Sequence, residues 1–144
     1  MLTKRMLHSR SEVEAFIGEF EARRLPKARW THEAHLVAGF WYTWCLERSA
    51  ALDAIRAYIR AHNEAVGTPN TDMSGYHETI TRLYMSAIAR HISDHSEASF
   101  EDALSSLLVS PLADRDWPLR YYSRERLFSA EARGRWVEPD VSQL

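Results

Sequence analysis

Apolar residues recur along this chain every three to four positions, which is the spacing of amphipathic helices. The pattern predicts helices over about residues 12–24, 32–48, 49–66, 76–93 and 100–109. Ser9 and Glu12 fit a capping box before the first helix, and Thr31 is a suitable N-cap for the second. No stretch has the alternation of β-branched residues that would indicate a strand. The sequence therefore predicts an all-α fold.

The second predicted helix is apolar on nearly every side between Leu36 and Leu46, so we expect it to be the most buried element. The segment of residues 68–75 has the composition of a loop. After Pro111 the chain has no long periodic stretch, and we expect it to wrap over the body in short helical turns. Residues 1–144 are thus predicted to form a single-domain helical bundle of four to five main helices with an irregular C-terminal tail.

Charge and composition narrow the classes of partner. The net charge of −2 gives no general attraction to nucleic acid, and the longest apolar stretch is shorter than the roughly 20 residues that span a bilayer. Cys45 is the single cysteine, and its apolar neighbours predict a buried thiol in a reducing compartment. Residues 1–10 lack the apolar core of a secretory signal. These features predict a cytoplasmic protein that binds neither nucleic acid nor membranes.

Four of the seven histidines are predicted to meet at one end of the bundle. Short connections favour antiparallel neighbours, so the second and fourth helices should begin at the end where the third helix finishes. His32 and His35 lie in the first turn of the second helix, and His77 lies in the first turn of the fourth. His62 lies in the last turn of the third helix, on its apolar stripe. We therefore expect three separate segments to bring their imidazoles together.

Our first hypothesis is a small-molecule enzyme or binding protein with a metal-dependent site in this cluster. His32 and His35 are three residues apart, so their Cβ atoms should lie about 5–6 Å apart on one helix face. With His77 they would supply three imidazoles for one divalent ion such as zinc, iron or nickel. Glu78 is the candidate catalytic residue, because a carboxylate beside such an ion can act as a general base.

His62 and Arg82 are the candidate substrate-binding residues, and a small anionic molecule is the expected ligand. Two helix N-termini at one end carry partial positive charge, which disfavours a cation and favours an anion. A metal-free anion-binding protein is therefore one alternative. A non-catalytic helical interaction module is the other, and it predicts an exposed apolar patch on the Trp-rich second helix and self-association into a homodimer.

Four sequence blocks resemble an uncharacterised family of short bacterial hypothetical proteins over most of the chain. The blocks are W-T-H-E-A-H-L at 30–36, H-N-E-A-V-G-T-P-N-T at 62–71, G-Y-H-E-T-I-T at 75–81 and Y-Y-S-R-E-R-L-F-S-A-E-A-R at 121–133. That family has no established activity, so the resemblance assigns no catalytic residue. The layout is also similar to DinB-like bundles, which hold one metal with three histidines, but this sequence lacks their H-x-x-x-H spacing near the C-terminus.

Overall fold

The computed structural model describes residues 9–144, and every regular element in that range is a helix. The α-helices are α1 (Arg10–Glu21), α2 (His32–Cys45), α3 (Arg48–Ala65), α4 (Glu78–Asp94), α5 (Phe100–Leu108), α6 (Arg124–Leu127) and α7 (Ala130–Gly134). Three short 3-10 helices join them: η1 (Lys27–Arg29), η2 (Pro111–Ala113) and η3 (Trp117–Arg120). The all-α prediction is confirmed. The expectation about a secretory signal concerns residues 1–10, of which 1–8 lie outside the described residues.

Local capping signals decide where the helices begin. Ser9 and Glu12 form the expected capping box of α1, and the Thr31 hydroxyl accepts a hydrogen bond from the Ala34 amide at the start of α2. The expected boundary between the second and third helices was wrong by a few residues. Because Leu46 is extended, α2 ends at Cys45, and α3 begins at Arg48 with Glu47 as its N-cap. A carboxylate is favourable there, since it accepts two backbone N–H groups at the positive end of the helix.

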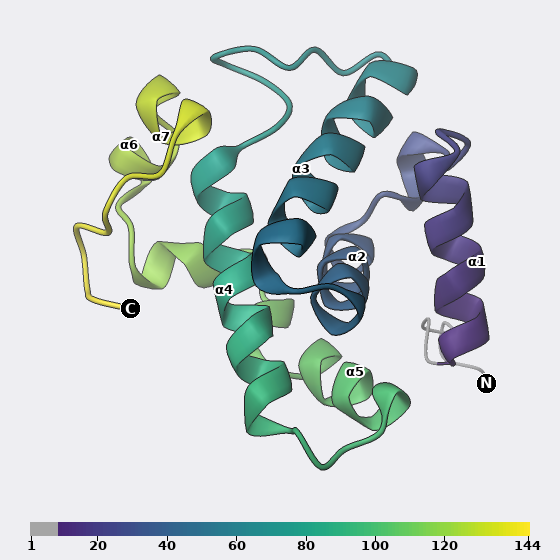
Figure 1. The fold of residues 1–144 in the computed structure, drawn as a ribbon. Coiled ribbons are helices and arrows are strands. Elements are labelled where there is room, and N and C mark those ends of the chain that lie inside the picture. The colour runs from purple at the N-terminus through teal and green to yellow at the C-terminus, as the bar shows by residue number, and fades with distance from the viewer. Residues whose placement is uncertain (1–8) are drawn as a thin grey trace, which may run out of the picture.

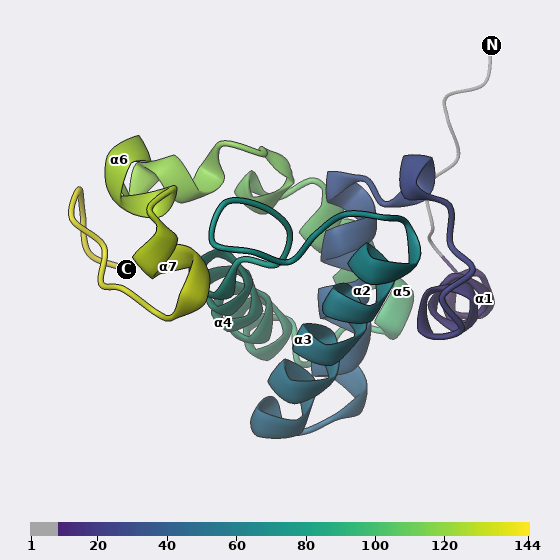
Figure 2. The ribbon, with the colours of Figure 1, turned by 90° about the horizontal axis from the view of Figure 1, so that it is seen from above.

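Helix α2 occupies the middle of the molecule and contacts α1, α3, α4 and α5 (Figure 1). Its central position agrees with its apolar sequence. Helix α1 and the short pair α6 and α7 lie on opposite sides of this body (Figures 1 and 2). A long loop of residues 66–77 leads from the end of α3 to the start of α4. Among residues 9–144, no helix combines the length and the apolar character needed to cross a membrane.

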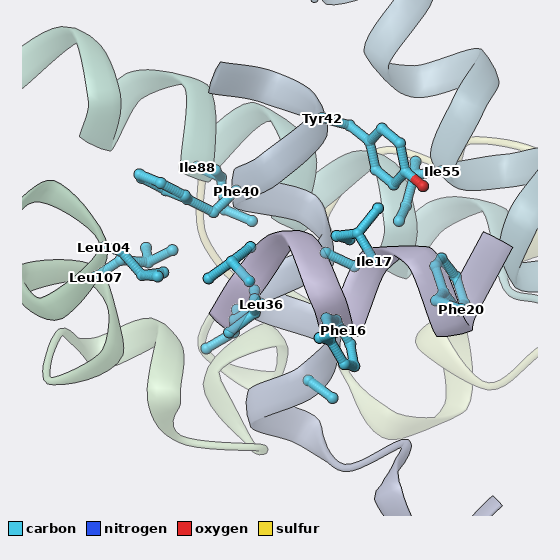
Figure 3. Packing of buried hydrophobic residues seen from close by; sticks show 14 of the residues in the cluster. Phe16, Ile17, Phe20, Leu36, Phe40, Tyr42, Ile55, Ile88, Leu104 and Leu107 are labelled. Carbon is cyan, nitrogen blue, oxygen red and sulfur yellow. The ribbon is translucent and has the colours of Figure 1, made fainter. Parts of the chain in front are cut away.

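The main core forms where α1, α2, α3, α4 and α5 meet, and Figure 3 shows its interdigitated side chains. The labelled members are Phe16, Ile17, Phe20, Leu36, Phe40, Tyr42, Ile55, Ile88, Leu104 and Leu107. A second cluster joins α4 to the C-terminal tail, with Trp117, Tyr122 and Leu127 buried beside Leu83. The expected tail of short helical turns wrapped over the body is therefore present. The expected buried thiol was wrong: Cys45 is exposed, because it is the last residue of α2 and lies beyond the buried part of this helix.

A histidine-lined cleft between α2, α3 and α4

Two adjoining cavities lie between α2, α3 and α4, at the end of the bundle where α2 and α4 begin. The larger has a volume of about 780 Å³ and the smaller about 410 Å³, and we call them the large lobe and the small lobe. Trp30, His35, Ile59, Ile80 and Thr81 line both lobes, so these five residues mark the junction between the two. We call the two lobes together the cleft.

The large lobe has mainly apolar walls. Leu36, Ile55 and Ile88 contribute from three different helices, and the tail closes one side with Leu119 and Leu127. The lining residues with hydroxyl, imidazole or charged side chains are Thr31, His32, His35, Thr81, Tyr84, Arg115 and Asp116. This combination of apolar walls and a few polar groups is typical of a pocket for a small organic molecule.

The loop of residues 66–77 forms part of the small lobe and is held in place by Asn70. The Asn70 side chain accepts hydrogen bonds from the Asn63 side chain and the Tyr76 amide, both at 3.0 Å, and donates to the Arg60 carbonyl. From the tail, Arg133 donates a hydrogen bond of 2.7 Å to the Gly75 carbonyl. The wall of the small lobe is therefore a fixed structure that depends on contacts from α3 and from the C-terminal tail.

His35 lies at the junction of the lobes and stacks against Trp30, with ring centroids 3.9 Å apart. Its Nδ1 atom donates a hydrogen bond of 2.7 Å to the Thr31 carbonyl. The side chain is accessible through the cleft, yet protein surrounds it on the other sides, so desolvation lowers the pKa of His35 to about 4. His32, His62 and Arg115 lower this pKa further, because each can carry positive charge nearby. His35 is therefore neutral at physiological pH.

His62 lines the small lobe and is only 1% exposed. Neither of its ring nitrogens has a hydrogen-bond partner in the described part of the chain. Its surroundings are aromatic, with ring centroids 5.2 Å from Trp30 and 5.9 Å from Phe20, and burial lowers the pKa of His62. A buried imidazole with two unsatisfied nitrogens is unusual, since more than 90% of buried polar groups have a partner.

His77 also lines the small lobe, but both of its ring nitrogens are used within the fold. Its Nδ1 atom accepts a hydrogen bond from the Ile80 amide and so caps α4, while Nε2 donates to the Leu127 carbonyl at 2.7 Å. His32 lines the large lobe and donates from Nε2 to the Leu112 carbonyl at 2.9 Å. His77 therefore fastens the tail to α4, and its ring has no nitrogen left for a ligand.

The expected convergence of histidines is found, but not as a metal-ligand set. His35, His62 and His77 line the small lobe, and His32 lines the adjoining large lobe. Within residues 9–144, no group of three or more His, Cys, Asp or Glu side chains is arranged to hold a metal ion. Helix direction correctly placed these residues at one end, whereas the carbonyl partners of His32 and His77 lie in the tail, which the helical pattern does not place.

Glu78 and Arg82 lie away from the cleft. The buried Glu78 carboxylate accepts two hydrogen bonds from Arg56, at 3.0 and 2.7 Å, and one from the Tyr76 hydroxyl at 2.7 Å. Burial would raise the pKa of Glu78, but these donors outweigh it and the pKa is lowered. Arg82 stacks over the Trp136 ring at 5.4 Å. Neither residue lines either lobe. Glu78 instead links α4 to α3 through Arg56, and Arg82 links α4 to the C-terminal tail through Trp136.

Three contributors to the cleft were not singled out from the sequence. Trp30 is partly buried, and its indole contacts both His35 and His62. The Tyr84 hydroxyl is buried without a partner in the described residues, at the large lobe. Arg115 arrives from the irregular tail, where no periodic signal indicates position. Of these three residues, only Trp30 could have been connected with the site from the sequence, because it immediately precedes Thr31, the N-cap of α2.

Comparisons with protein-family models, with curated proteins and with solved structures find no match for this chain. The geometry of the cleft therefore carries the functional argument.

Proposed function

We propose that this protein binds a small organic molecule in the cleft, with His62 and His35 making the polar contacts. The lobes, at about 780 and 410 Å³, have the size of known ligand pockets, which span roughly 300–1,000 Å³. The walls are apolar apart from a few polar groups at the junction and the rim. A bound molecule would remove this apolar surface from water, which favours association.

The buried, unpartnered imidazole of His62 is the observation that carries the proposal. A buried polar group without a hydrogen bond costs about 1–3 kcal/mol of folding free energy. His77, on the same lobe, shows that the fold can satisfy both nitrogens of a histidine. A ligand in the small lobe that displaces the side chains covering these buried nitrogens would give His62 the hydrogen bonds that the protein itself withholds.

The interaction module has less support. The exposed large apolar side chains come from scattered segments: Leu46, Met73, Val109, Phe128, Val141 and Leu144. On the Trp-rich helix α2, Trp41 and Trp44 pack partly against the core and do not form an exposed patch. Phe128, the one exposed apolar residue of this set that lines the cleft, belongs to the ligand site instead.

A fragment screen of the full chain by ligand-observed NMR tests the proposal. We expect fragments that bind the wild type to bind His62→Leu about tenfold more weakly, because a hydrogen bond worth about 1.4 kcal/mol is lost. His95→Leu is the matched control, since His95 lies at the far end of α4 with partners in α4 and α5. The proposal is wrong if no fragment binds, or if both variants bind the hits as well as the wild type.

A further inference from the structure

The hydrogen bond from His35 to Thr31 fixes which ring nitrogen carries the proton. The partner atom is a backbone carbonyl oxygen, which can only accept, so the Nδ1 atom of His35 must be the donor. In a neutral imidazole, the other nitrogen is then an acceptor. The Nε2 atom of His35 has no hydrogen-bond partner among the described residues, and the side chain faces both lobes. The cleft thus offers a lone pair at its junction.

This lone pair persists over the physiological pH range. Desolvation lowers the pKa of His35 to about 4, and the three neighbours with potential positive charge act in the same direction. Protonating Nε2 to receive an anion would therefore be unfavourable at neutral pH. A carboxylate placed against this atom would face a lone pair with no proton between them.

We infer, on the basis of the proposed function, that the ligand has an uncharged polar end whose hydroxyl or amide N–H donates to the Nε2 atom of His35. His62 also lines the small lobe and can act as donor on one nitrogen and acceptor on the other, but both nitrogens are buried, so its contact with the polar end requires neighbouring side chains to move. This inference favours an alcohol or an amide over the small anionic molecule expected from the sequence.

Few charged side chains line the cleft. Arg115 and Asp116, which are adjacent in sequence and of opposite charge, line the large lobe. Lys27 is the charged side chain of the small-lobe lining among the described residues. Arg115 is near enough to His35 to lower its pKa, so binding of a carboxylate through this guanidinium is the competing outcome of the test.

The rest of the ligand is apolar, because the large lobe is. Leu36, Ile55 and Ile88 supply aliphatic walls, and Gly39 keeps the α2 side narrow. A Cβ atom at Gly39 would lie 2.8 Å from the Ile88 Cδ1 atom, so even an alanine would need this wall to shift. The Tyr84 side chain also lines this lobe, although its hydroxyl group is buried.

Four probes of matched shape test the inference: phenylbutanol, its methyl ether, phenylbutanamide and phenylbutanoate. Their affinities for the wild-type protein are measured by calorimetry at neutral pH. We expect the alcohol and the amide to bind about tenfold more tightly than the ether, because the ether leaves the acceptor unpaired. The carboxylate should bind no better than the ether.

The variant His35→Phe keeps a ring against Trp30 but has no acceptor, so the preference for alcohol over ether should disappear. Long-range nitrogen NMR of the wild type gives a second measurement, in which the alcohol but not the ether shifts the Nε2 resonance of His35.

The remaining outcomes separate the two claims. If phenylbutanoate binds most tightly, or if all four probes bind equally, the ligand does not need an uncharged donor group. The cleft would then still be a binding site. No binding of any probe overturns both.

Discussion

His62 and His77 line the same small lobe, but only His77 has hydrogen-bond partners for its two ring nitrogens. The difference arises from position. His77 lies at the start of α4, within reach of the Ile80 amide and of the tail carbonyl of Leu127. His62 lies on the apolar stripe of α3 beside Trp30, where the fold supplies only aromatic neighbours. The pair therefore separates a structural histidine from one whose ring nitrogens the described residues leave without partners.

Replacing His62 with leucine should stabilise the ligand-free protein. The substitution removes two unpartnered buried nitrogens, so the free energy of unfolding should rise by about 1–3 kcal/mol. Chemical denaturation of both proteins, followed by circular dichroism, measures the change. A loss of stability would instead mean that the His62 ring has a structural role, and would remove the main support for the binding site.

His77→Leu is the matched substitution and should have the opposite effect. It breaks the N-cap of α4 and the link to Leu127, leaving the Ile80 amide and the Leu127 carbonyl without partners. We expect a loss of about 2–3 kcal/mol in the free energy of unfolding. The same denaturation experiment applies, and an unchanged midpoint would contradict the assigned hydrogen bonds.

Glu78 should make the stability of the protein depend on acid pH. Although its burial acts the other way, the donors Arg56 and Tyr76 leave its pKa below the ordinary value of 4.5. The carboxylate therefore stabilises the fold above pH 4.5, and this contribution is lost as the pH falls through the lower pKa of the folded state.

Glu78→Gln should lower the free energy of unfolding by about 1–3 kcal/mol at neutral pH, because charged hydrogen bonds from Arg56 are lost. Its stability should also fall less steeply than that of the wild type below pH 4.5. Denaturation curves over a pH series measure both effects. If the stability of the two proteins changed with pH in the same way, the pKa of Glu78 would not be lowered by its contacts with Arg56 and Tyr76.

His35 should titrate near pH 4, with the proton of its neutral form on Nδ1. The unfolded chain takes up this proton near the ordinary value of 6.5, so His35 should lower the stability of the fold as the pH falls from 6.5 to about 4. Nitrogen-detected NMR reports both the midpoint and the tautomer. In Trp30→Ala, the midpoint should move toward 6.5, because one aromatic wall around His35 is removed. A wild-type midpoint near 6.5 would contradict the enclosed position of the ring.

Gly75 and Gly67 form a matched pair in the loop that walls the small lobe. Both have φ near +80°, so alanine at either position should lower the free energy of unfolding by about 1–2 kcal/mol. A Cβ atom at Gly75 would also collide with the backbone of Pro69 and Asn70, whereas one at Gly67 meets nothing within 4 Å. Gly75→Ala should therefore have the lower melting temperature of the two. Equal melting temperatures would mean that the loop can move aside.

The sequence by itself determined the helices and the end of the bundle at which the histidines gather. Helical periodicity and capping pairs such as Ser9 with Glu12 are local signals, and chain direction follows from short connections. The tertiary structure decided what each histidine does. The partners of His32 and His77 are the carbonyls of Leu112 and Leu127, 80 and 50 residues away in the chain. These contacts depend on how an irregular tail packs against α4, and no periodic pattern encodes that packing. For the same reason, the sequence could bring His62 to this end but could not reveal that its nitrogens would lack partners.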